Sequence, residues 1–184
     1  MCAPCWDAVA RVPPPLWTGP HITVGAAGGR HEGTLRDIIH AYKYDGRQSL
    51  ATPLGRLMRD AGASLLSDAD CVVPVPLFPW RRLSRGFNQA ADLARKMDRP
   101  VVHALWRWRP TSPQAALPAA SRRSNVHGAF VRSPLTMGLN DRVVVLIDDV
   151  KTTGATLSAC ARILKQSGAR EVRALTAATA DLRS

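Results

Sequence analysis

The sequence lacks any long apolar run, and its first residues lack the pattern of a secretion signal. No apolar segment reaches the roughly 18–20 residues that span a bilayer. The chain opens on cysteines and prolines, where a signal peptide has a basic and then an apolar stretch. The hydrophobic fraction of 46% and the charged fraction of 21% are typical of a folded globular protein. These observations argue against a membrane protein, a secreted protein and a disordered chain.

Cysteine is scarce and dispersed, at positions 2, 5, 71 and 160. Cys71 and Cys160 lie in strongly apolar segments, as ordinary core residues do. Four dispersed cysteines in a chain of 184 residues do not form the disulfide framework of a small secreted domain. We therefore expect a reducing, cytoplasmic location.

Lysine and acidic residues are few beside arginine. The 25 Lys and Arg residues outnumber the 14 Asp and Glu residues, which gives a formal net charge of +11, and 21 of the 25 are arginine. Arginine is suited to bidentate contacts with phosphate, so the excess favours a polyanionic ligand or a nucleic acid. A GC-rich coding sequence produces the same bias toward arginine, and the total charge leaves both explanations open.

The length suits one α/β domain with a small appendage. Residues 1–20 are rich in Pro and Trp and have no periodicity, so they are predicted to form an N-terminal appendage. Residues 21–27 predict a strand. Two amphipathic helices follow, because apolar residues recur at helical spacing. The first carries Leu35, Ile38, Ile39 and Tyr42 on one face, and the second carries Leu50, Leu54, Leu57, Met58, Ala61 and Leu65.

Strands and helices alternate from residue 70 onward. The β-branched run at 142–147 is typical of a parallel strand that is buried on both faces. The alternation predicts right-handed βαβ units and an α/β fold with a doubly wound, mainly parallel sheet. We expect strands at 71–77, 101–105, 142–147 and 171–177, the last closing the sheet, and helices near 88–97 and 156–167.

The strongest chemical signal is the segment 143–156, where an apolar strand ends in two carboxylates and a Thr/Gly loop opens a helix. Asp148 and Asp149 stand at the carboxyl end of the strand, where such sheets bind ligands, and can accept hydrogen bonds from adjacent ribose hydroxyls. The loop offers N–H groups, threonine hydroxyls and a helix N-terminus to a phosphate, and Gly154 allows close approach. A simple helix cap is the alternative, but two acids beside a buried sheet are costly to place.

This segment resembles the phosphoribosyl-pyrophosphate (PRPP) motif of type I phosphoribosyltransferases. The resemblance extends to the ComF (competence protein F) family, through KYDGR (43–47), VPVPL (73–77), RGFNQA (85–90), LIDDVKTTGATL (146–157) and the 114–130 stretch. Together these motifs cover roughly residues 20–180. The resemblance implies a phosphoribosyltransferase-like domain at 21–184, with a hood at about 21–66 and a core at about 67–184.

The resemblance also implies a PRPP site. Asp148 and Asp149 would hold the ribose hydroxyls, and Mg²⁺ would be bound mainly through ligand oxygens. Arginines just beyond the pyrophosphate loop suit its charge, although a solvated basic helix start is the alternative. The 5-phosphate would lie at Lys151, Thr152, Thr153, Gly154, Ala155 and Thr156. The pyrophosphate would lie at Pro74, Val75, Pro76 and Leu77, with Arg81, Arg82 and Arg85 nearby.

Residues 107–128 would correspond to the mobile catalytic loop of the family, which would exclude water while charge develops at the ribose C1. An exposed linker with arginines for solubility is the alternative. The candidate residues of this loop are Arg109, Gln114, Arg122, Arg123 and Asn125.

Two departures from the family pattern bear on function. Thr152 stands where purine-type relatives often carry an acidic side chain that serves as base, so no general base is identified and activity is left open. Relatives usually begin with a four-cysteine zinc module, whereas this chain has only Cys2 and Cys5, half of a tetrahedral site. These two cysteines remain candidate zinc ligands, and we expect any zinc to be substoichiometric or shared between chains.

Two hypotheses about function follow. In the first, the protein transfers ribose 5-phosphate from PRPP to a nitrogen acceptor that the sequence does not identify. In the second, a non-catalytic protein binds PRPP, a nucleotide or single-stranded DNA and acts in DNA uptake, as the ComF resemblance implies. The segment Trp106-Arg107-Trp108-Arg109 suits base stacking and phosphate contacts, although tryptophans facing the core are slightly favoured. A homo-oligomer is compatible with either hypothesis.

Overall fold

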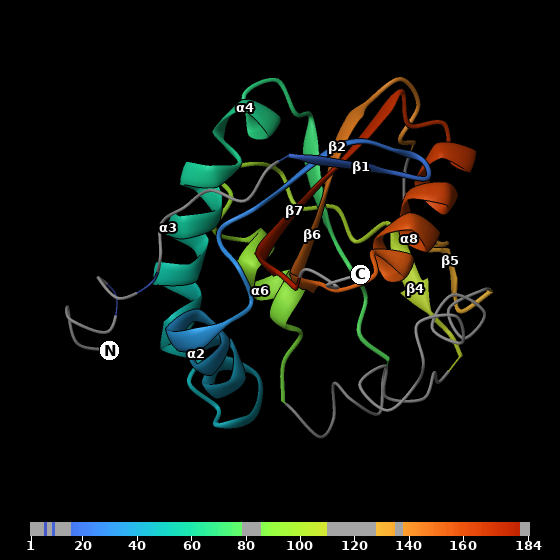
Figure 1. The fold of residues 1–184 in the computed structure, drawn as a ribbon. Coiled ribbons are helices and arrows are strands. Elements are labelled where there is room, and N and C mark those ends of the chain that lie inside the picture. The colour runs from blue at the N-terminus through green and yellow to red at the C-terminus, as the bar shows by residue number, and fades with distance from the viewer. Residues whose placement is uncertain are drawn as a thin grey trace.

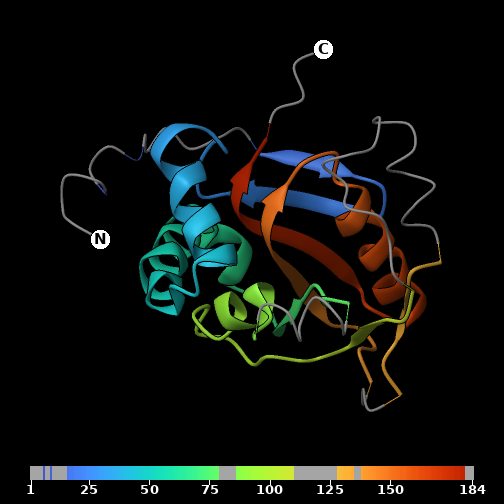
Figure 2. The ribbon, with the colours of Figure 1, turned by 90° about the horizontal axis from the view of Figure 1, so that it is seen from below.

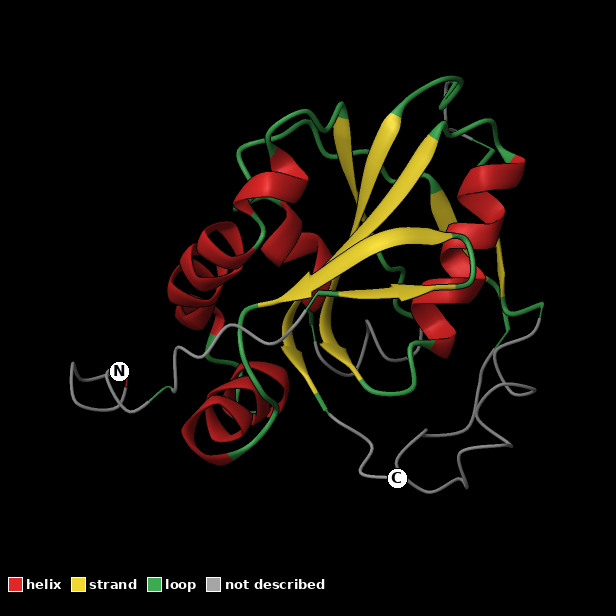
Figure 3. Cartoon of the chain, turned by 45° about the horizontal axis from the view of Figure 1, so that its top comes forward, coloured by secondary structure: helices red, strands yellow, loops and turns green. Residues whose placement is uncertain are grey.

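The centre of the molecule is a five-stranded sheet, drawn as the fan of strands in Figures 1 and 3. The computed structural model describes residues 6, 9, 16–78, 86–109, 128–134 and 138–180. The strand order is β1-β2-β7-β6-β3, with β1 antiparallel to β2 and the other neighbours parallel. The strands are β1 (Trp17–Gly19), β2 (Ile22–Ala27), β3 (Cys71–Pro74), β6 (Val143–Lys151) and β7 (Glu171–Thr179), and a separate antiparallel pair is β4 (Leu105–Arg107) with β5 (Phe130–Arg132).

Helices cover both faces of this sheet, as Figure 2 shows. Strand β6 supplies both cores: Val145 and Ile147 pack with the α2, α3 and α6 side, whereas Val144 and Leu146 pack with α8. All four side chains are fully buried, which explains the unbroken apolar run of a strand covered on both faces. The predicted α/β fold with a mainly parallel sheet is therefore confirmed. The helices are α2 (Gly33–Tyr44), the 3₁₀ turn η1 (Gln48–Leu50), α3 (Ala51–Ala61), α4 (Ala63–Leu66), α6 (Gln89–Ala94) and α8 (Ala155–Gln166).

The helices form close to their predicted positions, with one division. The helix predicted through residues 50–65 is broken at Gly62 into α3 and α4. A Cβ at Gly62 would lie 2.5 Å from Cδ2 of Leu175 on β7, so the chain passes too close to the sheet for any side chain there. The close approach lets α3 pack directly on β7.

Three predictions about strands are wrong. The segment 101–105 does not form a strand of the main sheet: Val101 makes a single bridge to Val72, and regular pairing begins only at Leu105, with β5. Strand β7 does not close the sheet, because β2 pairs with its free side. Strand β6 does not end at residue 147; it continues to Lys151, since β7 is long enough to pair with it to Thr179.

The first two strands come from segments predicted to lie outside the core. Strand β1 falls within the predicted appendage 1–20, and β2 falls within the predicted hood 21–66. Both belong to the main sheet, because the small residues Gly25, Ala26 and Ala27 pair in register with β7. The sheet therefore draws its strands from both sides of residue 66.

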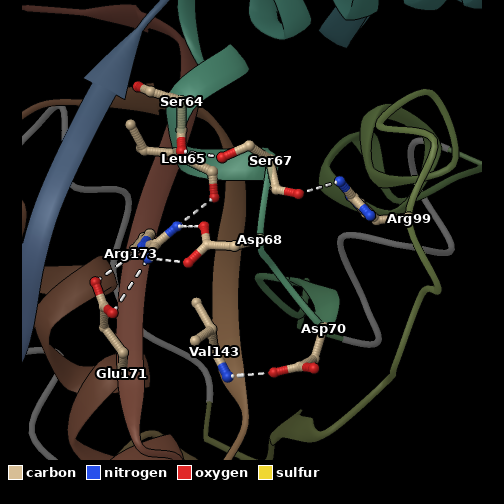
Figure 4. Close-up of polar contacts among 9 residues, drawn as sticks. All are labelled: Ser64, Leu65, Ser67, Asp68, Asp70, Arg99, Val143, Glu171 and Arg173. Atoms are coloured by element: carbon tan, nitrogen blue, oxygen red, sulfur yellow. Dashed lines mark hydrogen bonds and ion pairs between the residues drawn. The ribbon is translucent and has the colours of Figure 1, made fainter.

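A buried arginine joins the segments at the amino ends of the parallel strands, at the edge of the sheet opposite their carboxyl ends (Figure 4). Arg173 on β7 donates hydrogen bonds to the Leu65 carbonyl at 3.0 Å, to both carboxylate oxygens of Asp68 and to Glu171 at 2.8 Å. Nearby, the Asp70 carboxylate accepts a hydrogen bond from the backbone N–H of Val143 at 2.7 Å. These contacts tie the segment before β3 to β6 and β7.

In the described part of the chain, no helix has both the length and the apolar character needed to cross a membrane.

Candidate functional site

A cavity of about 800 Å³ opens at the carboxyl ends of β3 and β6. In doubly wound sheets this is the edge at which ligands bind, because the loops that follow parallel strands meet there. The end of α2 and the start of α6 complete the walls. Ten of the predicted site residues line it: Val75, Pro76, Leu77, Asp148, Asp149, Lys151, Thr152, Gly154, Ala155 and Thr156.

The remaining predicted residues divide into two groups. Pro74, Thr153 and Arg109 are described but do not line this cavity. The others lie outside the described residues and stay predictions: Cys2, Cys5, Arg81, Arg82, Arg85, Gln114, Arg122, Arg123 and Asn125.

The two carboxylates belong to the last part of β6 and do not follow it. Asp148 is opposite Thr176 of β7, and its Oδ1 accepts a hydrogen bond from the backbone N–H of Asp149 at 2.9 Å. Oδ1 of Asp149 lies 2.8 Å from Nζ of Lys43, at the end of α2. Pairing with β7 thus holds both acids rigidly at the edge of the cavity.

Burial and like charge dominate the electrostatics of this pair. Burial of Asp148, together with the neighbouring Asp149, raises the pKa of the Asp148 carboxyl from 3.8 to about 7. The N–H of Asp149 and the positive charges of Lys43 and Arg107 partly oppose that rise in the pKa. Near neutral pH the Asp148 carboxyl therefore exists in both protonation states, and its protonated form can donate a hydrogen bond as well as accept one.

The phosphate-type loop runs from Thr152 to the start of α8. Gly154 has a φ of 75°, in the left-handed region that favours glycine, and α8 begins at the next residue. The hydroxyl of Thr153 accepts a hydrogen bond from the Ala155 N–H at 3.3 Å, so it serves the helix start instead of the cavity. The threonines that line the cavity are Thr152 and Thr156. A 12-residue helix whose first turn faces the cavity attracts an anion there.

Lys151 turns toward the first strand. Its Nζ lies 4.9 Å from the ring centroid of Trp17, a cation–π contact. The indole lies flat over Gly25, where a Cβ would come within 2.3 Å of the ring. Strand β1 therefore positions a basic side chain at the mouth of the predicted phosphate site.

The structure assigns roles to two residues of the RGFNQA motif (85–90) that the sequence alone had not explained. Asn88 of RGFNQA caps α6, because its Oδ1 accepts hydrogen bonds from Ala90 and Ala91, and its Nδ2 donates to the Val75 carbonyl at 3.4 Å. Phe87 packs against Tyr42, with ring centroids 5.4 Å apart. These contacts join α6 both to α2 and to the loop after β3.

Ten residues that line the cavity were not predicted as site residues, among them His31, Lys43, Asn88 and Arg107. Lys43 and Asn88 lie in the motifs KYDGR and RGFNQA, so the sequence marked their positions. It did not show that Lys43 pairs with Asp149 or that Asn88 contacts Val75. Arg107 is brought in by the alternation of β4, in which Leu105 is buried and Arg107 reaches the cavity. His31 has no signal in the sequence that marks it.

The slightly favoured prediction that the tryptophans face the core is wrong. The side chains of Trp106 and Trp108 are 57% and 55% exposed, because the inward positions of this strand are taken by Leu105 and Arg107. The guanidinium of Arg109 lies 4.6 Å from the Trp108 ring centroid, and the indole N–H of Trp108 donates to the Gly128 carbonyl at 2.8 Å. The outer face of the β4–β5 pair is therefore aromatic and basic.

Comparison with known proteins bears on both the fold and the motifs. Residues 83–181 match the model of the phosphoribosyl transferase domain family. The chain is 34% identical over 153 residues to DNA utilization protein YhgH of Escherichia coli (strain K12), and the match covers 76% of this chain and 64% of that protein. It is 32% identical over 155 residues to competence protein F of Haemophilus influenzae, covering 79% of this chain and 68% of that protein.

A solved orotate phosphoribosyltransferase from Aeropyrum pernix overlaps 95% of this chain and 89% of its own, at 17% identity and a TM-score of 0.44. The chain spans 64% of the length of the E. coli relative. The family model covers more than half of the chain, and the H. influenzae relative is covered over more than two thirds of its length. The chain therefore belongs to the phosphoribosyl transferase domain family, in the branch that contains competence protein F.

Proposed function

We propose that this chain binds PRPP in the cavity at the end of β6 and transfers its ribose 5-phosphate to a nitrogen acceptor. One observation carries the proposal: the paired carboxylates, the Thr/Gly loop and the loop after β3 all line a single cavity. PRPP has the matching order of groups, with a phosphate at one end, vicinal hydroxyls in the middle and a pyrophosphate at C1.

The ribose and the 5-phosphate match the β6–α8 side of the cavity. Asp148 and Asp149 are adjacent acceptors for the two hydroxyls, and charge-assisted hydrogen bonds of this kind are worth about 1.5–3 kcal/mol each. The 5-phosphate would take N–H donors from the loop and the first turn of α8. Lys151, held against Trp17, adds a positive charge on the same side.

The pyrophosphate matches the loop Val75–Leu77, one strand away from the carboxylates. Its first residue is fixed on both sides, because the Val75 N–H donates to the Ile147 carbonyl at 2.9 Å and the Val75 carbonyl accepts from Asn88. The Val75 N–H is taken by that contact and Pro76 has none, so the backbone donor that this fixed loop can present to an anion is the Leu77 N–H. Arg81, Arg82 and Arg85, which follow this loop in the sequence, are proposed to add positive charge to it.

Magnesium is proposed to enter with PRPP. Among the described residues, no group of three or more His, Cys, Asp or Glu side chains is placed to hold a metal ion. Phosphate and hydroxyl oxygens are the hard donors that Mg²⁺ prefers, and the ion commonly keeps few protein ligands. The cavity therefore suits a Mg²⁺ whose donors come mostly from the ligand, where it would neutralise part of the pyrophosphate charge.

The predicted catalytic loop begins beside this cavity, at Arg107. Arg107 pairs with Phe130 across β4 and β5, so the chain leaves and returns at neighbouring positions of one strand pair. Arg107 itself lines the cavity. We propose that the intervening segment, with Gln114, Arg122, Arg123 and Asn125, closes over bound PRPP and excludes water.

Calorimetric titration with PRPP and Mg²⁺ tests this proposal. Asp148→Asn combined with Asp149→Asn should abolish the binding seen for the unmodified chain while leaving cooperative thermal unfolding intact. A matched control is Asp60→Asn with Asp98→Asn, which changes the charge equally but lies outside the cavity lining. Equal PRPP affinity in all three proteins would show that the PRPP site does not include the carboxylates of β6.

A second function is favoured by the exposed tryptophans. The outer face of β4–β5 presents Trp106 and Trp108 with Arg109, a set suited to stacking bases of single-stranded DNA. The names of the relatives refer to DNA utilization and competence. We propose that this face binds single-stranded DNA, separately from the PRPP cavity, and a variant of both tryptophans described in the Discussion tests it.

A further inference from the structure

Transfer to a nitrogen acceptor needs a proton acceptor, and this inference therefore rests on the proposed function. When the acceptor N–H attacks C1 of PRPP, the N–C1 bond forms and the bond from C1 to the pyrophosphate oxygen breaks. Pyrophosphate leaves with the electron pair, and the acceptor nitrogen must release its proton. Thr152, in the phosphate loop, has no group that can take that proton near neutral pH.

The strand order fixes the side from which the acceptor enters. The pyrophosphate loop follows β3, which lies on one side of β6, whereas β7 and β2 lie on the other side. In an in-line displacement the nucleophile and the leaving group occupy opposite sides of the reacting carbon. With the ribose held at the end of β6, the acceptor nitrogen reaches C1 from the β7 and β2 side.

His31 lies on that side and is held there by backbone pairing. After β2, the chain continues beside the end of β7: Thr179 donates to the Gly29 carbonyl at 2.9 Å, and the His31 N–H donates to the Thr179 carbonyl at 2.8 Å. Thr179 is itself paired with Lys151 of β6. His31 is the one histidine among the described residues that line the cavity.

We propose that the imidazole of His31 accepts the proton of the attacking nitrogen and then passes it to solvent. His31 is thus the general base of the transfer, placed at the acceptor end of the cavity. The proton moves from the acceptor nitrogen to a ring nitrogen of His31 as the N–C1 bond forms, and no further reactant is needed.

The surroundings keep this imidazole neutral. The charged groups that act on it are Lys43 and Arg36 of α2 and Asp149 of β6. Burial and the Lys43 charge lower the pKa of His31 from 6.5, and Asp149 only partly opposes them. A neutral imidazole at pH 7 is free to accept a proton.

Asp148 is the rival base, since its pKa is raised toward neutrality. It lies on β6 beneath the ribose position and already accepts a hydrogen bond from the Asp149 N–H. A variant at position 31 distinguishes the two assignments. Loss of the imidazole removes the proton acceptor if His31 is the base, but leaves it in place if Asp148 is the base.

The test measures pyrophosphate release from PRPP with Mg²⁺ between pH 5 and 8, with adenine, hypoxanthine, orotate or water as the probe nucleophile. The rate of the unmodified chain should rise with pH to a plateau near neutrality. His31→Gln should lower the plateau at least ~100-fold and remove the rising limb of the pH profile, because a general base contributes ~10²–10⁴ to the rate. The PRPP affinity measured by calorimetry should change less than ~3-fold, because a general base need not contact PRPP.

Two further variants sharpen the result. Imidazole added to His31→Ala should restore part of the rate, whereas His103→Gln, an exposed histidine outside the cavity lining, should behave as the unmodified chain. A His31→Gln protein with the original rate and pH profile would overturn the assignment and favour Asp148. PRPP binding without pyrophosphate release in any probe would overturn the base but keep the binding site. Absence of PRPP binding in the unmodified chain would overturn the proposed function itself.

Discussion

Replacing the partly buried Asp148 by asparagine should stabilise the protein at neutral pH while destroying its ligand site. Burial and the adjacent Asp149 raise the pKa of this carboxyl from its ordinary value of 3.8, taken for the unfolded chain, to about 7 in the folded protein. Since one pKa unit corresponds to ~1.4 kcal/mol, the ionised carboxyl costs the folded state roughly 4 kcal/mol above pH 7. An asparagine of the same shape carries no charge and keeps an oxygen to accept from the Asp149 N–H.

The gain depends on pH in a defined direction. The folded protein binds the Asp148 proton more tightly than the unfolded chain, so the penalty is absent below about pH 4 and grows as the pH rises to 7. The asparagine side-chain amide also needs a hydrogen-bond acceptor, at a cost of ~1–3 kcal/mol when none is found. We therefore expect a net stabilisation of about 2 kcal/mol at pH 8 and a net destabilisation of about 2 kcal/mol at pH 4, where only the cost of the amide remains.

Urea denaturation of the unmodified chain and Asp148→Asn at pH 4.5, 6 and 8 measures this difference. A gain of 2 kcal/mol corresponds to an increase in Tm of roughly 4–8 °C for a chain of this size. Asp60→Asn, on the exposed side of α3, is the control and should show no such trend. Destabilisation at pH 8, or a difference that does not vary with pH, would show that burial does not set the ionisation of this carboxyl.

Three other results are expected. Arg173→Met should lower the free energy of unfolding by ~2–4 kcal/mol in urea melts, because it leaves two carboxylates and a carbonyl without their common donor, and an unchanged midpoint would contradict that role. Trp106→Ala with Trp108→Ala should weaken binding of a single-stranded oligonucleotide at ~0.2 M salt by ~1–3 kcal/mol per stacked base, with PRPP affinity unchanged, and retained affinity would exclude stacking by this pair. Elemental analysis should find less than one zinc per chain, and a full zinc equivalent that survives mutation of Cys2 and Cys5 would disprove their assignment.

The parts of the fold that local pattern governs could be predicted from the sequence. The run from Val143 to Ile147 is β-branched and apolar, so a buried strand was the clear expectation, and the apolar face of α2 followed helical spacing. The continuation of β6 through Asp148 to Lys151 was not predictable in this way. Acidic residues disfavour strands, and only the pairing with β7 overrides that preference.

Contacts between distant segments account for what sequence reasoning missed. Whether Trp106 faces inward or outward depends on the pairing of β4 with β5, more than 20 residues away, and the short segment carries no alternation that decides it. Gly62 leaves no room for a side chain because Leu175 of β7 lies against it, and the sequence around Gly62 does not show that contact. The pairing of Lys43 with Asp149 and the anchoring of His31 on β7 likewise arise from tertiary packing, so the composition of those segments could not identify them as part of the site.

The most direct measurement is a crystal structure of the chain with PRPP and Mg²⁺. We expect the 5-phosphate at the first turn of α8, both ribose hydroxyls on Asp148 and Asp149, and the pyrophosphate on the loop Val75–Leu77. We also expect C1 to be open toward His31. PRPP bound at any other surface, or bound in the cavity with its hydroxyls away from both carboxylates, would show that this cavity is not the PRPP site proposed here.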